Sequence, residues 1–209
     1  MVPTSLGPLA GQLHSPATAG RFAARRFSQV EVSAHRAAVL VALTDAPDPA
    51  VIVTRRAGTL AHHAGQVSFP GGALEPGETP VAAALREACE EVALDPAAVH
   101  VLGEFPPARI DVSRFAVRIV VGWWDGRAEL KPNPAEVASV AQLPLSALAD
   151  PAARFTWTHP RGLTGPGFTA HDLYIWGFTA FVLDAVLAAG GWEQDWDKTV
   201  QRPVPAEYR

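Results

Sequence analysis

Short apolar runs and longer periodic segments alternate along the chain and predict its secondary structure. The apolar runs that we expect to form strands are residues 37–43, 50–54, 99–102, 115–124, 136–141, 155–158 and 168–176. Turn-forming segments such as TDAPDP separate some of them, and we expect a loop at 105–114. We expect one turn of helix at residues 145–148 and a terminal amphipathic helix at residues 178–188. This mixture indicates an α+β domain.

The clearest helical segment lies between the second and third apolar runs. Thr79 followed by Pro80 predicts a helix start, because threonine can accept a backbone N–H and proline has no N–H to lose at the first position. The next residues, VAAALREACEEV, are mostly strong helix formers. At about 100° per residue, one apolar stripe can face a core; it contains Val81, Leu85, Ala88 and Val92.

Three glutamates, Glu87, Glu90 and Glu91, share the sector roughly opposite this stripe. Carboxylates at i, i+3 and i+4 repel each other when solvated, but a hard divalent cation reverses that effect. The preceding loop, PGGALEPGE, contains glycines that permit a close approach by a metal or a phosphate. An ordinary solvated acidic face is the alternative interpretation.

Composition bounds the class of protein. With 209 residues, 48% hydrophobic and 18% charged, the chain suits one globular domain. We expect a flexible N-terminal arm at 1–20, the domain at 21–190 and a C-terminal tail at 191–209. The net charge of −4 gives no nucleic-acid footprint, and no apolar run approaches the length of a membrane span. Cys89, the single cysteine, excludes an intrachain disulfide and is expected to pack on the helix flank. Together with the lack of a secretory signal, these features predict a cytoplasmic protein without nucleic-acid or membrane partners.

Residues 72–94 resemble the Nudix box, which reads Gly, five residues, Glu, seven residues, then Arg-Glu-apolar-x-Glu-Glu-x-Gly-apolar. The matching positions are Gly72, Glu78, Arg86, Glu87, Glu90, Glu91 and Leu94. Ala93 replaces the glycine near the helix end, which removes an easy left-handed cap and leaves the helix terminus open. The resemblance implies a Nudix fold, in which a mixed β-sheet is sandwiched between helices (α/β/α). It also implies a hydrolase that uses Mg²⁺ or Mn²⁺.

The residues before the box resemble a second signature, that of the coenzyme A diphosphatase branch of the Nudix hydrolases. The matches are Thr54, Arg56, Ala57, Gly65 and the run 69–72, FPGG. This resemblance implies a homodimer that cleaves coenzyme A or acyl-CoA to (acyl-)4′-phosphopantetheine and adenosine 3′,5′-bisphosphate.

One departure from the second signature keeps other functions open. Ala61 stands at its second arginine, so one bidentate phosphate contact is missing. This favours the alternative of another nucleoside diphosphate substrate, such as ADP-ribose, NADH or an oxidised nucleotide. A catalytically silent, nucleotide-sensing domain is a further alternative, against which the three adjoining carboxylates argue.

The resemblance also implies roles for individual residues. The expected metal ligands are Glu87, Glu90, Glu91 and, as an additional or second-sphere ligand, Glu78. We expect Arg86 to hold carboxylates through a bidentate pair, and Arg56, Gly71 and Gly72 to contact the substrate. The catalytic set is Glu91, Glu90 and Arg86, with Glu91 as the first candidate for the general base. Glu136, in NPAEVASV, is a second candidate for that base.

Overall fold

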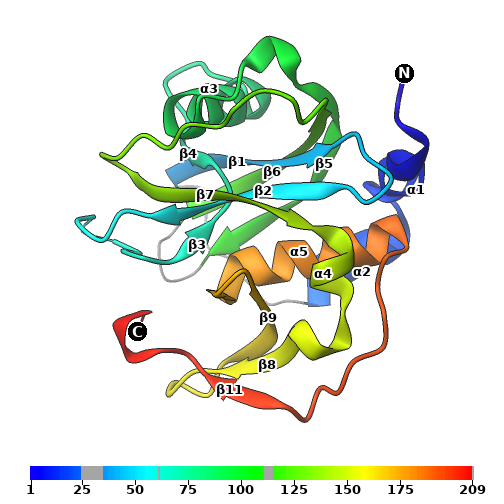
Figure 1. The fold of residues 1–209 in the computed structure, drawn as a ribbon, viewed down its shortest axis with the longest axis vertical. Helices are drawn as coiled ribbons and strands as arrows, with labels where there is room; N and C mark the ends of the chain where they lie inside the picture. Colours follow the sequence, from blue (N-terminus) through cyan, green and yellow to red (C-terminus); the bar gives the residue numbers. More distant parts are fainter. Residues whose placement is uncertain (25–34, 61, 111–114, 209) are drawn as a thin grey trace.

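The computed structural model describes residues 1–24, 35–60, 62–110 and 115–208 (Figure 1). Its α-helices are α1 (Gly7–Gln12), α2 (Pro16–Ala24), α3 (Pro80–Val92), α4 (Leu145–Ala149) and α5 (Gly177–Gly190). Its strands are β1 (His35–Thr44), β2 (Ala50–Arg56), β3 (Val67–Ser68), β4 (Gly71–Ala73), β5 (His100–Ile110), β6 (Phe115–Trp124), β7 (Val137–Pro144), β8 (Arg154–Thr158), β9 (Thr164–Ala170), β10 (Leu173–Ile175) and β11 (Gln201–Pro203). Short 3₁₀ turns lie at Thr4–Leu6, Pro96–Ala98, Pro151–Ala153 and Ala206–Tyr208.

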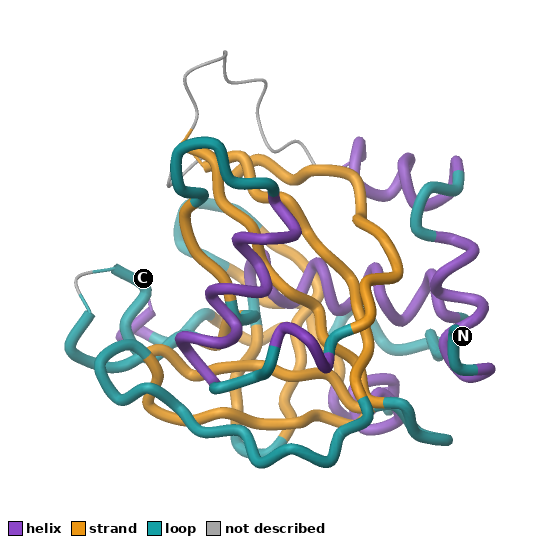
Figure 2. Tube along the Cα trace, turned by 90° about the horizontal axis from the view of Figure 1, so that it is seen from above, coloured by secondary structure: helices purple, strands orange, loops and turns teal. Residues whose placement is uncertain are grey.

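A mixed sheet forms the centre of the molecule. Its strand order is β3-β2-β1-β6-β5, and β4 pairs with β1 while β7 pairs with β2. Strands β1 and β6 are parallel, and the other pairs in this sheet are antiparallel. α3 lies over one face of the sheet and α5 over the other (Figure 1 and Figure 2). The structure therefore confirms the predicted α+β class and the mixed sheet between helices.

The strand β5 is longer than the sequence predicts. It continues through residues 105–110, where we expected a loop and where the chain contains two prolines. The pairing register with β6 shifts between Phe105 and Ala108. A bulge of this kind accommodates prolines inside a strand, because their missing N–H groups fall outside the regular ladder.

α3 packs on the sheet through small side chains. Ala83, Ala84 and Ala88 are buried against β1, together with Val92 at the helix end. Val81 and Leu85, which we expected to face the core, are only partly buried. The helix is thus rotated from the predicted stripe, because alanines allow its backbone to approach the sheet more closely than larger side chains would.

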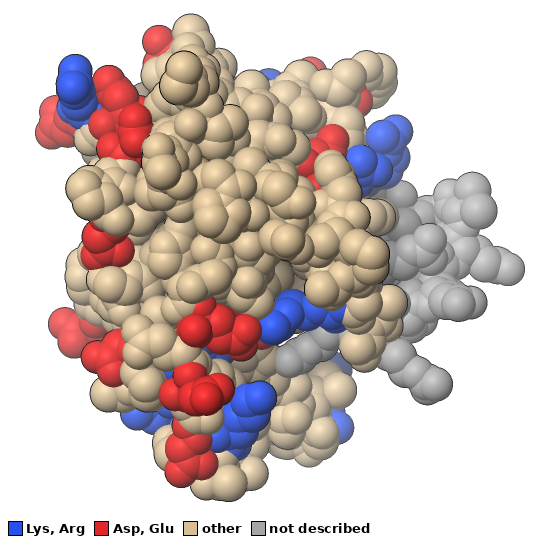
Figure 3. All heavy atoms as spheres, turned by 90° about the vertical axis from the view of Figure 1, so that its right-hand side faces the viewer, with Lys and Arg blue, Asp and Glu red and all other residues tan. Residues whose placement is uncertain are grey.

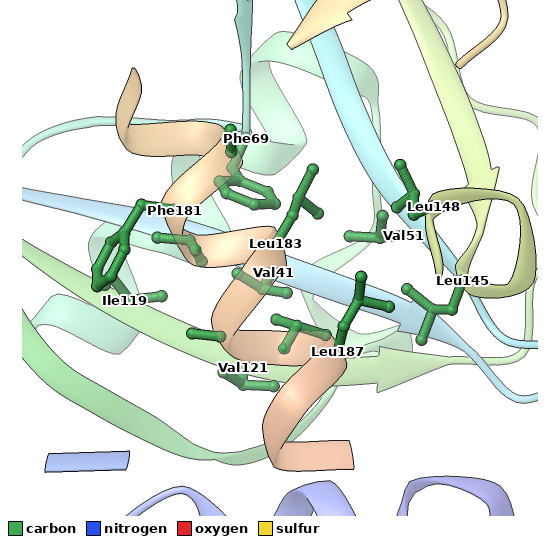
Figure 4. Close-up of a cluster of buried hydrophobic side chains, with 14 of the residues drawn as sticks. Val41, Val51, Phe69, Ile119, Val121, Leu145, Leu148, Phe181, Leu183 and Leu187 are labelled. Carbon is green, nitrogen blue, oxygen red and sulfur yellow. The ribbon is translucent and has the colours of Figure 1, made fainter. Parts of the chain in front are cut away.

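α5 is buried on nearly every side, so the prediction of an amphipathic helix was wrong. Its residues Phe181, Leu183 and Leu187 meet the side chains of the larger sheet (Figure 4). The helix is apolar all round because other elements cover the sides that do not face this sheet.

The N-terminal residues supply part of that cover. Leu6, Leu9 and Leu13 are at most 1% exposed, and Phe22 of α2 lies edge-on to Phe181 with ring centroids 4.9 Å apart. The structure therefore shows helices packed on α5 at 1–20, in place of the flexible arm that we expected. Leu6, Leu9 and Leu13 are spaced as on one face of a helix. The apolar area that they bury stabilises the packing of this segment on the core.

A second sheet, in the order β10-β9-β8-β11, forms a further layer below α5 (Figure 1). Its last strand comes from residues 191–209, which we expected to be a tail. β11 pairs in parallel with β8, and Val204 is fully buried beside Phe155 and Trp157. The burial of Val204 explains why this polar, proline-containing segment is ordered against the sheet.

The charges on the surface and the lengths of the helices bear on the expected absence of nucleic-acid and membrane partners. On the face shown in Figure 3, acidic and basic side chains of the described residues are interspersed and do not gather into a basic patch. None of the helices in the described ranges is both long and apolar enough to cross a membrane.

Candidate functional site

α3 begins and ends at the residues that the sequence indicates. Thr79 Oγ1 accepts a hydrogen bond of 3.2 Å from the Ala82 N–H, which confirms the predicted cap. At the other end, Ala93 adopts the left-handed conformation, with φ 57°. Its N–H donates to the carbonyls of Ala88 and Cys89. The helix therefore ends at the glycine position of the motif without a glycine, at a cost of about 1 kcal/mol. Cys89 is exposed, contrary to the expected packing role.

Arg86 binds the carboxylates around it. Its Nε and Nη2 donate to the two oxygens of Glu78 at 3.0 and 3.1 Å, which is the bidentate pair expected of it. Its Nη1 donates to Glu87 at 2.9 Å and to Glu90 at 3.2 Å, and Nη2 also reaches the carbonyl of Ala73. The hydrogen bonds from Arg86 lower the pKa of Glu78. Arg86 thus fixes the acidic face of α3 to the strand β4.

Glu91 is the buried member of the acidic set. It is 2% exposed, and its Oε2 accepts a 3.2 Å hydrogen bond from the Gly71 N–H. Burial raises its pKa to about 7; the Gly71 hydrogen bond and the charge of Arg56 oppose this shift, and the charges of Glu87 and Glu136 add to it. A carboxyl group that titrates near neutral pH can exchange a proton under ordinary conditions, as a general base must.

Gly71 and Gly72 allow the backbone of the loop to pack closely against β1 and the carboxylates of α3. A Cβ atom at Gly72 would lie 2.4 Å from Glu87 Oε1, so the Glu87 carboxylate rests directly on the loop backbone. A Cβ atom at Gly71 would lie 2.4 Å from the carbonyl oxygen of Ala38 in β1. Burial is also the main reason why the pKa of Glu87 is raised. The two glycines therefore bring β4 against both the sheet and α3.

Arg56, at the end of β2, lies beside Glu91. Its Nη1 is 4.0 Å from Glu91 Oε1, at the limit of an ion pair. Its Nε is buried and has no hydrogen-bond partner among the described residues. A buried donor without a partner is costly, so this atom is available to an acceptor from a bound anion. Ala61, the departure from the second signature, lies outside the described residues.

A segment after β6 completes the site, and the sequence did not predict its contacts. The N–H groups of Lys131 and Asn133 donate to the carbonyls of Val92 and Glu91 at the end of α3. The carbonyl of Glu136 accepts from the Ala57 N–H, one residue beyond Arg56. Asn133 also accepts from the Ala135 N–H, a local turn that the sequence NPAE could have indicated. Through these bonds Glu136, the second candidate base, comes close enough to raise the pKa of Glu87 and Glu91.

The donor chemistry of the site suits Mg²⁺ or Mn²⁺, since carboxylate oxygens are their usual protein ligands. Glu91 in particular is a buried carboxylate, and among the described residues its one ion pair is the long contact of 4.0 Å with Arg56. The side chains are not yet gathered around one point. In the described part of the chain, no three His, Cys, Asp or Glu residues converge closely enough to hold a metal. Glu87 and Glu90 are instead neutralised by Arg86.

Comparison with known proteins gives concordant matches. The family model for the NUDIX domain matches residues 34–163. A Nudix hydrolase NudL of Cronobacter sakazakii, described as uncharacterized, is 37% identical over 185 residues, covering 81% of this chain and 93% of its own. The protein of the same name from Pectobacterium atrosepticum is 39% identical over 157 residues, covering 71% and 79%.

Solved structures show the same fold at low sequence identity. A NUDIX hydrolase from Nitrosomonas europaea superposes with a TM-score of 0.52 and 11% identity, over 84% of this chain and 82% of that one. A MutT/nudix family protein from Enterococcus faecalis gives a TM-score of 0.51 and 14% identity, over 89% and 73%.

Proposed function

This chain belongs to the Nudix hydrolase family, and we propose that its substrate is coenzyme A or an acyl-CoA. The reaction is hydrolysis of the diphosphate bond, which yields (acyl-)4′-phosphopantetheine and adenosine 3′,5′-bisphosphate. Nudix hydrolases act on small nucleotide-derived substrates, so the proposal concerns which substrate this member takes.

One observation carries the proposal. Two residues of the coenzyme A signature, Arg56 and Gly71, meet at the buried carboxylate of Glu91, which belongs to the Nudix box. The two motifs are thus parts of one site. The unpartnered Arg56 Nε supports a role for this residue in contacting a phosphate oxygen.

Nudix hydrolases generally use divalent metal ions. We assign the ligands here to Glu87, Glu90 and Glu91, with Glu78 acting through Arg86 as a second-sphere group. A bound Mg²⁺ or Mn²⁺ would neutralise phosphate charge and lower the pKa of an attacking water.

Side chains and backbone of the protein supply the remaining roles in the proposed reaction. Glu91 accepts the proton of the attacking water, and Glu136 is the alternative for this step. Arg86 positions Glu87 and Glu90 on the acidic face. Gly71 and Gly72 keep the backbone close to the reacting phosphates because they lack a side chain.

The substrate is tested by mass spectrometry of products from coenzyme A, ADP-ribose and NADH, each with Mg²⁺ or Mn²⁺. Phosphopantetheine and adenosine 3′,5′-bisphosphate, with little turnover of the other two, are the expected result. Preferential cleavage of ADP-ribose or NADH, the alternative that Ala61 favours, would retain the enzyme class and reject coenzyme A. Absence of turnover with all three would favour the silent, nucleotide-sensing domain.

The ligand assignment is tested by Glu90→Gln. The Glu90 side chain is 56% exposed, so we expect the fold to be preserved while turnover falls by several orders of magnitude. The matched control is Asp45→Asn, an exposed carboxylate in the turn between β1 and β2, which should keep full turnover. Near-normal activity of Glu90→Gln would reject Glu90 as a ligand.

A further inference from the structure

A pocket of about 270 Å³ lies outside the carboxylate site, between the edge of the larger sheet and the C-terminal segment. Its apolar lining comes from Val67, Leu173 and Pro205. These residues belong to β3, to β10 and to the chain after β11. Figure 1 shows the C-terminal turn on the same side of the molecule as β3, and a hydrogen bond from Gln66 to the Tyr208 carbonyl joins them.

Two tyrosines form rigid walls of this pocket. The Tyr174 hydroxyl donates to the carbonyls of Arg202 and Pro203, at 3.2 Å each, and its ring centroid is 5.0 Å from that of Phe155. The Tyr208 ring lies against Gly65, where a Cβ atom would be 3.4 Å from Cε1. Aromatic walls held by the protein itself reduce the entropy that a ligand would lose on binding.

Three charged residues at the pocket have no side-chain partner among the described residues. Arg55, Asp172 and Glu207 line it and are exposed. None of their side chains makes a hydrogen bond or an ion pair with another residue in the described ranges. The carboxylates of Asp172 and Glu207 offer acceptors to N–H donors of a ligand, and the Arg55 guanidinium offers donors to a phosphate such as the 3′-phosphate of coenzyme A.

The backbone beside the pocket is also unusual. His171 and Asp172, in the turn before β10, have φ values of 48° and 61°, and His63, in the loop that leads to Gly65, has 57°. Such conformations are uncommon outside glycine and concentrate at ligand sites.

Size and position restrict the ligand further. A volume of about 270 Å³ is below that of a site for a whole drug-sized ligand, but suits one base with its sugar. Val67 in the pocket and Gly71 in the carboxylate site are four residues apart, a separation that an extended chain spans in at most about 14 Å. Val67 packs on the α5 side of the sheet and β3 is its edge strand, so a nucleoside in the pocket would reach a diphosphate at Gly71 around this edge.

We propose that this pocket binds the adenine nucleoside of the substrate, with the base between Tyr174 and Tyr208 and its amino group donating to Asp172 or Glu207. The connection to the diphosphate rests on the proposed function. Binding of the nucleoside itself does not, since free adenosine contains no diphosphate.

The test is calorimetric titration of the whole chain with adenosine and with inosine, which has a carbonyl in place of the amino group. We expect saturable binding of adenosine and weaker binding of inosine. Tyr208→Ala should weaken adenosine about tenfold or more, the usual loss for a base that stacks on an aromatic ring, whereas Tyr208→Phe should retain it.

The carboxylates are tested by Asp172→Asn and Glu207→Gln. Asparagine tolerates the positive φ at position 172, so the first change removes charge without disturbing the turn. At least one of the two variants should reduce the preference for adenosine over inosine severalfold, whereas Asp45→Asn should leave it unchanged. Absence of adenosine binding, or binding that Tyr208→Ala, Asp172→Asn and Glu207→Gln all leave unaltered, would overturn the proposal. Hydrolysis of coenzyme A, measured separately, would still test the proposed function.

Discussion

At the scale of single residues, the site is defined by how little space surrounds its carboxylates. Glu91 is buried with one hydrogen bond, and Glu87 rests on the backbone of Gly72. Burial favours the neutral form of both side chains, as the direction of their pKa shifts shows. The site therefore holds carboxylates whose ionised forms an arriving cation would stabilise.

Glu91 makes the stability of the metal-free protein depend on pH. Its pKa is about 7 in the folded protein, against an ordinary value of 4.5, so the folded state binds the proton more tightly. Its contribution is fully present below pH 4.5 and is lost as pH rises through 7. We expect the free energy of unfolding to fall by roughly 3 kcal/mol over this window. Urea denaturation at pH 5 and pH 8 with a chelator measures this; Glu91→Gln should show a much smaller fall, and an equal fall would contradict the assignment.

Alanine substitutions at Gly71 and Gly72 should have different effects on stability and on kcat. Gly71→Ala places a methyl group 2.4 Å from the backbone of Ala38, which cannot move without disturbing β1, so we expect a loss of about 2 kcal/mol or more of stability. Gly72→Ala meets only the end of the Glu87 side chain, which can turn away. It should therefore keep most of the stability but lose at least tenfold in kcat, because Glu87 leaves its position. Denaturation curves and initial rates compare the pair, and equal stability losses would refute the distinction.

At the scale of elements, the limits of α3 were predictable because local chemistry sets them. Thr79, Pro80 and the residues up to Val92 encode the helix in their own sequence. Its rotation was not predictable, since the choice between the Leu85 face and the Ala84 face depends on the sheet that receives it. The same holds for the helix α1 and the strand β11, whose burial depends on partners distant in the chain.

Ala93 leads to a prediction at this scale. Since it holds a left-handed conformation at the end of α3, Ala93→Gly should stabilise the protein by about 0.5–1 kcal/mol. Ala82→Gly, at an exposed position in the first turn of the same helix, should destabilise it by up to about 1 kcal/mol. Thermal denaturation of the two variants gives opposite shifts of Tm if the left-handed cap is the cause. Shifts in the same direction would exclude that cause.

At the scale of the whole molecule, an ionic network joins the second sheet to the helices. Arg154 of β8 is fully buried and pairs with Asp184 of α5, which also pairs with Arg21 of α2. The Arg154 guanidinium lies over the rings of Phe168 and Trp196, at 4.3 and 4.7 Å from their centroids. Desolvation lowers the pKa of Arg154, although Asp184 opposes the shift.

Because Asp184 pairs with a buried arginine, we expect it to contribute strongly to stability, although it lies far from the carboxylate site. Asp184→Asn leaves the buried Arg154 charge without its counter-charge, so we expect a loss of about 3–5 kcal/mol. Glu193→Gln removes a half-exposed partner of Arg21 and should cost less than about 1 kcal/mol. Urea denaturation measures both, and similar small losses would show that the network contributes little.

The exposed Cys89 also has a practical consequence. It is the single thiol of the sequence, and it precedes Glu90 on α3. A maleimide fluorophore would therefore attach at one known position, next to the acidic face. Its emission could report the arrival of Mg²⁺, Mn²⁺ or a nucleotide at that face without the introduction of another cysteine, because Cys89 is already exposed.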